Sequence, residues 1–150
     1  MDLAVVWNSQ TFTGDWGVGK GDLAIDPGGL RSAVLLSLFT DKAAPPGYVP
    51  PAASLATRRG YWGDTYAKRP IGSWLWTLDR SIKSGDLGLL NDVDDICSEA
   101  LQWLIEDGVV NTVSVNSVWQ QPNVIATNTV LTPPNSPLVE FLFAWAWQGT

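Results

Sequence analysis

The stretch EALQWLIEDGVVNTVSVNSVW, residues 99–119, decides the fold class, because a helical pattern changes to a strand pattern within it. Apolar positions in residues 84–108 recur every three or four residues, as in a helix with one buried face. Residues 109–119 alternate apolar and polar side chains, as in a half-buried strand. The positions that carry these patterns are Leu90, Val93, Cys97, Ala100, Leu101 and Leu104 in the helix, and Val109, Val113, Val115 and Trp119 in the strand.

Two more strands are predicted downstream, at residues 124–132 and 138–147, with turns at 121–123 (QPN) and 133–137 (PPNSP). The alternation is weak in the first of these strands and sharp in the second, LVEFLFAWAW. Helices followed by an antiparallel meander indicate an α+β domain, with the helices packed on a small C-terminal sheet. One face of the last strand is expected to carry Val139, Phe141, Phe143, Trp145 and Trp147.

The N-terminal part is predicted to begin with a strand at residues 2–7, followed by turns over 10–22 and a short strand at 23–25. Residues 26–29 (DPGG) turn the chain into a helix at 30–40. The apolar face of this helix is wide, which predicts that it is covered on most sides. That face contains Leu30, Val34, Ser37 and Leu38, widened by Ala33, Leu36 and Phe39.

The middle of the chain contains a Pro-rich stretch, residues 41–54 (DKAAPPGYVPPAAS). Its prolines favour an extended conformation, and the stretch is too short to separate two domains. We therefore predict one domain over residues 1–150 with a Pro-rich surface arm. A second helix is predicted at 71–82, weakened by Gly72.

Acidic residues cluster on the strongest helix, where Asn91 or Asp92 is expected to cap its start, with Asp94 and Asp95 in the first turn. Gly108 is expected to follow its C-terminus. A metal or acid–base site is the alternative for these carboxylates. Adjacent helical residues point apart, however, and the spacing of a calcium-binding loop is missing, so a capped, solvated helix is favoured.

The composition excludes several classes of function. The net charge is −6 and the basic residues form no group larger than a pair, which argues against a nucleic-acid partner. The chain has no histidine and one cysteine, Cys97, on an apolar helix face, so no catalytic centre, metal or cofactor is predicted. No apolar run approaches the roughly 20 residues of a membrane helix, and the N-terminus lacks a basic signal region.

The motif RGYWGD, residues 59–64, places Tyr61 and Trp62 between two glycines, Gly60 and Gly63. These glycines suggest a backbone conformation that other residues cannot adopt. Two interpretations remain open. In one, the loop folds back on the protein's own core, with Arg59 and Asp64 paired. In the other, it docks on a partner protein.

The chain contains nine tryptophans, a residue enriched where proteins bind proteins. Trp74, Trp76 and Trp103 are expected in the core. The face of the last strand is either an inner sheet face or part of an edge that recruits a strand from another chain. The predicted partner-binding residues are Arg59, Gly60, Tyr61, Trp62, Gly63, Asp64, Phe141, Phe143, Trp145 and Trp147.

Taken in order, five motifs and the strands that follow them resemble the Mu-like phage baseplate wedge proteins, which are related to the lysozyme-like inner-baseplate, or sheath-initiator, family of contractile tails. RGYWGD and EALQWLIEDGV are the specific ones, and the resemblance extends from about residue 2 to the last strand. The motifs are GDLA (21–24), LRSAVLLSLFTD (30–41), RRGYWGD (58–64), IGSWLW (71–76), EALQWLIEDGVV (99–110) and the strands that follow.

The resemblance implies a small α+β domain without catalysis, located in the tail baseplate of the virion and assembled in the host cytoplasm. It also implies sixfold copies around the hub or spike, contacts with the larger wedge subunits, and a sheet edge on which the tail sheath is templated. The Glu-Pro-Arg motif that the broader family has near its wedge contact is missing, and residues 58–72 occupy the corresponding region. The competing hypotheses are a carbohydrate- or peptide-binding module and a glycosidase that uses carboxylates alone.

Overall fold

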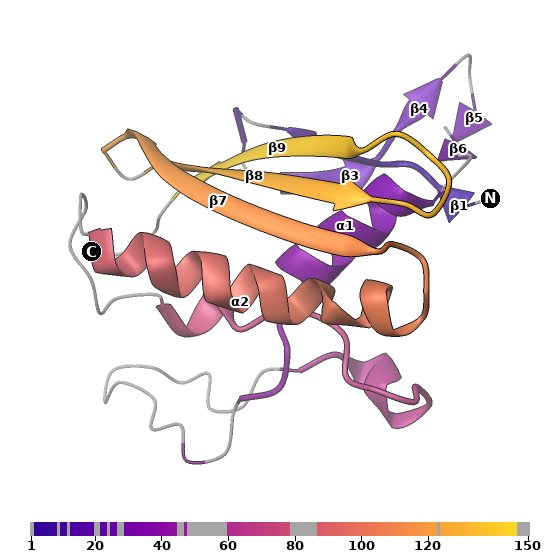
Figure 1. The fold of residues 1–150 in the computed structure, drawn as a ribbon, viewed down its shortest axis with the longest axis horizontal. Coiled ribbons are helices and arrows are strands. Elements are labelled where there is room, and N and C mark those ends of the chain that lie inside the picture. The colour runs from indigo at the N-terminus through magenta and orange to yellow at the C-terminus, as the bar shows by residue number, and fades with distance from the viewer. Residues whose placement is uncertain are drawn as a thin grey trace.

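The computed structural model describes residues 2–8, 10–11, 13–19, 22–23, 25–26, 29–44, 47, 60–78, 87–122 and 124–146 of the 150-residue chain. At its centre is a three-stranded antiparallel sheet in the order β7–β8–β9. Helix α2 runs along one face of this sheet, and helix α1 lies beside α2 (Figure 1). This arrangement confirms the predicted α+β class with the sheet in the C-terminal part. The elements are α1 (Leu30–Phe39), α2 (Leu87–Glu106), β7 (Thr112–Gln121), β8 (Val124–Thr132) and β9 (Val139–Ala146).

The sheet register directs odd-numbered side chains toward the helices, over 113–119 in β7, 125–131 in β8 and 139–143 in β9. Ser117 lies opposite Thr127, which lies opposite Phe143, and all three are buried. Leu142 is 66% exposed on the other face of the sheet, so the sharp alternation predicted for the last strand is confirmed. The ladder is regular except for a shift between Trp119 and Gln121.

Helix α2 ends in a Schellman motif, as the position of Gly108 indicated. The N–H of Gly108, whose φ is 73°, donates to the carbonyl of Ile105 (3.0 Å). The N–H of Val109 donates to the carbonyl of Leu104 (2.9 Å). These two bonds satisfy carbonyls that the end of a helix leaves unpaired, and they turn the chain toward β7. The buried face of the helix consists of Leu89, Leu90, Val93, Cys97, Ala100, Leu101 and Leu104.

The predicted N-terminal cap of this helix is wrong. The helix begins one turn earlier than expected, at Leu87, so Asn91 and Asp92 are exposed residues inside it and its first turn holds no acidic residue. The physical reason is that Leu89 and Leu90 are buried and already belong to the apolar face.

Helix α1 contributes Val34, Leu35 and Leu38 to the core that it shares with α2 and the sheet. Leu36 is 44% exposed, so its predicted place on the buried face is wrong, and Leu35 is the buried residue instead. At the end of α1, the Phe39 ring contacts one residue from the N-terminal part of the chain and one from the C-terminal part. It stacks on Trp7 with centroids 4.2 Å apart and meets Phe143 edge-on at 6.0 Å.

The turns predicted over residues 10–22 are wrong in part, because this region also forms strands. Antiparallel pairing places Val5 opposite Trp16 and Asn8 opposite Thr13. The side chain of Asn8 accepts hydrogen bonds from the N–H groups of Gln10 (2.9 Å) and Thr11, which closes the turn locally. The strands are β1 (Asp2–Leu3), β2 (Val5–Asn8), β3 (Thr13–Trp16), β4 (Val18–Gly19), β5 (Asp22–Leu23) and β6 (Ile25–Asp26), paired as β1–β6, β2–β3 and β4–β5.

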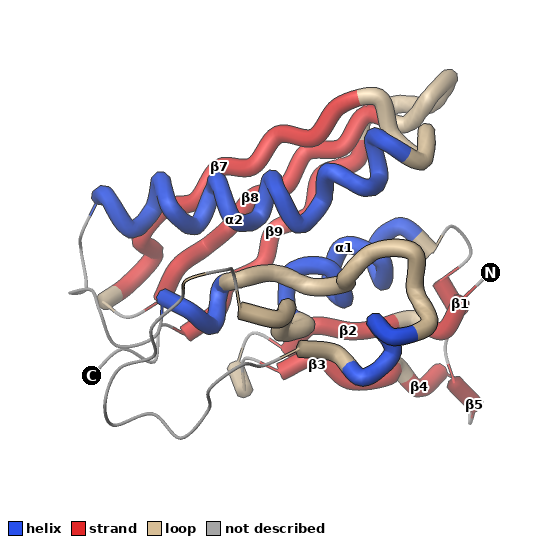
Figure 2. Tube along the Cα trace, turned by 90° about the horizontal axis from the view of Figure 1, so that it is seen from below, coloured by secondary structure: helices blue, strands red, loops and turns tan. Residues whose placement is uncertain are grey.

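The helix predicted over residues 71–82 is wrong for the part that the structure describes, where only the short 3-10 helix η2 (Leu75–Leu78) forms. Gly72 has a φ of 106° and lies against the carbonyl of Thr40, where a side chain would collide. Ser73 then donates its N–H to that carbonyl (2.9 Å), so this backbone pairs with another segment and not within a helix. Figure 2, a view from below, shows the resulting loop on the near side of α1. The same loop contains the 3-10 helix η1 (Trp62–Thr65).

Candidate partner-binding surfaces

The described part of the RGYWGD motif, residues 60–64, forms a tight turn in which the N–H of Asp64 donates to the carbonyl of Tyr61 (3.1 Å). Tyr61 is 39% exposed, and a Cβ built on Gly63 would collide with Cε1 of the Tyr61 ring. Gly63 has no positive φ, whereas Gly60 has a φ of 150° and packs against Ala43. The special backbone conformation expected of the glycines is therefore found at Gly60. At Gly63 the backbone needs no positive φ, so the expected reason for a glycine is wrong there. Glycine is required because the Tyr61 ring occupies the space that a side chain would need.

We predict that Gly63→Val lowers the free energy of unfolding by about 1–3 kcal/mol, because the new side chain must push the Tyr61 ring aside. Urea denaturation measures the loss. The matched test is the same substitution in a Tyr61→Ala background, where the ring is gone and the added cost should fall below about 1 kcal/mol. An equal cost in both backgrounds would show that the ring is not the obstacle.

Asp64 stabilises the loop from within. Its Oδ1 accepts the N–H of Ile71 (2.9 Å), which ties the start of the loop to the segment that docks on α1. A pair between Asp64 and Arg59 remains a prediction, because Arg59 lies outside the described residues. The backbone of Trp62 begins η1.

Two tryptophan side chains attach this loop to the rest of the molecule through neighbouring carbonyls. The indole N–H of Trp76 donates to the carbonyl of Lys42 (2.8 Å), and that of Trp74 donates to the carbonyl of Ala43 (2.8 Å). Trp103, on α2, donates to Oγ of Ser37 on α1 (3.0 Å). Trp76 is buried as expected, whereas Trp74 and Trp103 are only partly buried and act also as hydrogen-bond donors.

Ion pairs add to this attachment. Nζ of Lys42 lies 2.7 Å from Oε1 of Glu99 and 4.6 Å from the centroid of the Trp74 ring. Arg69 contacts Glu106 (3.1 Å) and Asp107 (2.7 Å) at the end of α2, where the helix dipole also favours a cation. The loop over residues 60–78 is therefore held at several points, and it presents Tyr66, 86% exposed, to solvent.

Three of the aromatic residues predicted as a second contact surface, Phe141, Phe143 and Trp145, belong to β9. Phe143 is fully buried in the core, and Phe141 is half-buried beside it, with ring centroids 6.2 Å apart. A partner can therefore reach Phe143 only through its backbone. Trp145 belongs to the strand through its backbone, opposite Ile125, and Trp147 lies outside the described residues.

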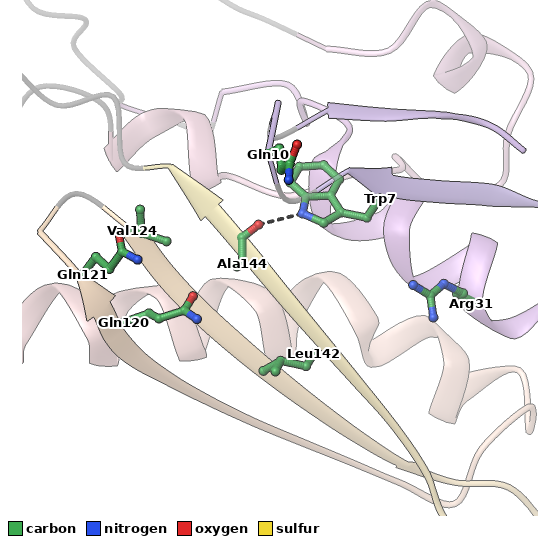
Figure 3. Close-up of a pocket in the computed structure, with 8 residues that line it drawn as sticks. All are labelled: Trp7, Gln10, Arg31, Gln120, Gln121, Val124, Leu142 and Ala144. Carbon is green, nitrogen blue, oxygen red and sulfur yellow. Dashed lines mark hydrogen bonds between the residues drawn. The ribbon is translucent and has the colours of Figure 1, made fainter.

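The outer edge of β9 is partly covered by the N-terminal hairpin. The indole N–H of Trp7 donates to the carbonyl of Ala144 (2.6 Å; Figure 3), which shows that this carbonyl faces away from β8. Main-chain groups alternate between the two edges of a strand, so those of Glu140 and Leu142 point to the same outer edge. Among the described residues, no strand pairs with this edge.

A groove of about 620 Å³ lies beside β9 (Figure 3). Leu142 and Ala144 of β9 form part of its floor, on the sheet face away from the helices. Trp7 and Gln10 of the hairpin and Arg31 of α1 stand on the opposite side, beyond the strand edge. Gln120, Gln121 and Val124 complete the lining.

The described residues contain little that resembles catalytic chemistry. Burial raises the pKa of the Cys97 thiol to about 12, which leaves it protonated and unreactive at neutral pH. No group of three or more potential metal ligands occurs in the described part of the chain. In that same part, no helix combines the length and apolarity that crossing a membrane requires.

Asp94 is an acidic residue whose pKa clearly departs from its ordinary value. Burial against the sheet raises its pKa above the ordinary 3.8, and hydrogen bonds with Ser117 oppose the increase. A raised folded-state pKa means that the carboxyl favours folding most below pH 3.8 and loses this contribution as pH rises through the folded-state value.

We therefore predict that Asp94→Asn makes the protein more stable than wild type at about pH 7, and that the difference disappears at about pH 3. Denaturant titrations at both pH values measure this, and Asp92→Asn, an exposed position on the same helix, is the control. A loss of stability in Asp94→Asn at neutral pH would mean that the ionised carboxylate makes favourable contacts that outweigh its burial.

Sequence reasoning missed the roles of three residues at the β9 groove. Trp7 lies in a predicted strand and Arg31 in a predicted helix, and neither pattern predicts what these two side chains contact. The alternation places Leu142 only on the face of the last strand opposite its aromatic residues. Trp7 and Ala144 are 137 positions apart, so no local pattern signals their contact. The available signal was that the predicted strand 138–147 places two leucines, Leu138 and Leu142, on the face opposite its aromatic residues. Both leucines are exposed in the structure, Leu138 just before β9 and Leu142 within it.

Comparisons with known proteins agree on one group of relatives. A family model described as phage protein GP46 matches residues 30–137, from α1 to the connection before β9. The baseplate protein gp46 of Escherichia phage Mu is 33% identical over 154 residues, covering 99% of this chain and 98% of that protein. The Mu-like prophage FluMu protein gp46 of Haemophilus influenzae is 32% identical over 148 residues, covering 98% of each.

Proposed function

This chain belongs to the GP46 family of Mu-like phage baseplate proteins, and on that premise we propose that it is an inner wedge component that initiates the tail sheath. Its role is structural and its place is the phage tail baseplate. The proposal adds two finer tasks. The chain binds the larger wedge subunits and the hub, and its C-terminal sheet receives a strand from the sheath of a contractile tail.

The observation that supports strand addition is the small sheet itself. One face is covered by helices, which fixes the register, while both outer strands lack a further partner strand among the described residues. An added strand gains main-chain hydrogen bonds that contribute about 0.5–1.5 kcal/mol each. Copies arranged in a ring with sixfold symmetry, as we propose here, would multiply this attachment.

The loop over residues 60–78 supports wedge binding. Its side chains attach it to residues 42–43, which follow α1, by indole hydrogen bonds and to α2 by an ion pair, so little conformational entropy would be lost when a partner binds. It presents Tyr61 and the strongly exposed Tyr66, a residue type enriched in protein interfaces. We assign Arg59, Gly60, Trp62, Gly63 and Asp64 to this same surface.

Site-specific photo-crosslinking in assembled baseplates tests both tasks. We expect a crosslinker at Tyr66 to capture a large wedge subunit, and one at Leu142 to capture sheath. Leu87, 73% exposed at the start of α2, is the control position and should capture neither. The sheath-initiator assignment fails if Leu142 captures no sheath protein in tails that carry sheath.

The proposal includes no enzymatic activity, because the chain has no histidine and the thiol of Cys97 is inactivated by burial. We predict that the purified protein does not cleave peptidoglycan in a turbidity assay, with a lysozyme sample as the positive control. Reproducible cleavage that is lost on a single Asp or Glu substitution would overturn this.

A further inference from the structure

Among the described residues that line the groove beside β9, Arg31 is the one with a charged side chain. Its guanidinium carbon lies 5.8 Å from the ring centroid of Phe141 and 6.0 Å from that of Phe143. Within the described part of the chain, no carboxylate forms an ion pair with it. The cation is therefore held at the strand edge by aromatic rings, with its hydrogen-bond donors available.

The open section of the β9 edge lies next to this cation. The indole N–H of Trp7 donates a hydrogen bond to the carbonyl of Ala144. The outward main-chain groups of Leu142, in contrast, have no strand partner among the described residues. Leu142 also lies between Phe141 and Phe143 in the chain, the two residues whose rings Arg31 covers. A strand that pairs at Leu142 therefore passes beside the guanidinium.

Covering a guanidinium removes water from it, and a buried charge without a partner is costly. The occupant of the groove must therefore supply an acceptor for Arg31. A carboxylate fits best, because it can accept two parallel hydrogen bonds from the planar guanidinium. A neutral segment would gain the same main-chain bonds and leave the cation unpaired.

We propose that the β9 groove accepts an extended segment of another protein chain that carries an acidic side chain, and that Arg31 selects this segment by pairing with its carboxylate. The inference rests on the proposed strand addition. It adds that the strand binds at the outer edge of β9, that the incoming segment is acidic, and that Arg31 binds its carboxylate.

Backbone NMR of the isotope-labelled full chain tests this with two short synthetic peptides of alternating valine and threonine, identical except for a central glutamate or glutamine. We expect the glutamate peptide at millimolar concentration to shift the amide signals of Leu142 and Ala144, and to bind about two- to fivefold more tightly than its partner. Arg31→Gln should abolish the difference between the peptides. Lys68→Gln, the same charge change at an exposed position in the 60–78 loop, should preserve it.

The possible results separate the inference from the function on which it rests. Equal binding of the two peptides at Leu142 overturns the role of Arg31 and leaves strand addition standing. Shifts confined to the outer amides of β7 place the added strand on the other edge and also overturn the inference. If neither peptide shifts any amide of the sheet, strand addition itself is contradicted.

Discussion

Phe143→Ala is expected to lower the free energy of unfolding by about 3–5 kcal/mol, the usual cost of removing a buried phenylalanine ring. The ring is fully buried and joins α1 to the sheet through its edge-on contact with Phe39. Because Phe39 also stacks on Trp7, the cavity would loosen the hairpin that covers the β9 edge. Urea denaturation followed by circular dichroism measures the loss.

The matched control is Leu142→Ala, the adjacent position on the same strand. Its side chain is 66% exposed on the opposite face, so truncation should change stability by no more than about 0.5 kcal/mol. If the two substitutions cost the same, the core is not on the helix-facing side of β9, and the register described above is wrong.

Leu142→Pro is expected to reduce sheath attachment about tenfold or more while the protein still folds. The Leu142 N–H points to the outer edge of β9, so proline removes a donor that β8 does not use. An incoming strand loses that hydrogen bond and meets the ring of the proline as an obstacle. A loss of about 1.4 kcal/mol per copy corresponds to a factor of ten, and a ring of copies amplifies it.

Two controls make this result interpretable. Phe141→Pro places the proline where the N–H faces β8, opposite Thr129, and should disrupt the sheet itself. Circular dichroism must show that Leu142→Pro retains its sheet. Tails that carry normal sheath on a folded Leu142→Pro protein would contradict addition at β9.

The long elements could be predicted from the sequence because each repeats its pattern over several turns or strand positions. In α2, seven buried residues follow one helical face, so the pattern indicates without ambiguity which side of the helix packs on the sheet. The strands β7 and β9 were recognised for the same reason, since alternation indicates which side chains face the helices, whereas β8 alternates only weakly. The predicted start of the first strand at Val109 is wrong, because Val109 takes part in the turn that ends α2 and β7 begins at Thr112. The pairing order of the three strands then follows from short connections.

Short elements escaped prediction because contacts distant in sequence determine them. The IGSWLW segment has helical spacing, yet the carbonyl of Thr40 pairs with Ser73 and holds Gly72 in a conformation outside the helix. The β2–β3 hairpin is marked only by the Asn8 turn. Of the predicted contact residues, Asp64 proved to have an internal hydrogen-bond partner, which no spacing rule could reveal.

The bond between Trp7 and Ala144 has a consequence for the order of events during synthesis. Its partners are 137 positions apart, and at about 5–20 residues per second the ribosome needs roughly 7–27 s to make the second after the first. During that interval the Trp7–Phe39 stack lacks the Phe143 ring that meets it in the finished fold. Nascent chains therefore expose aromatic surface until β9 emerges, and chaperone demand should be concentrated in this late stage of translation.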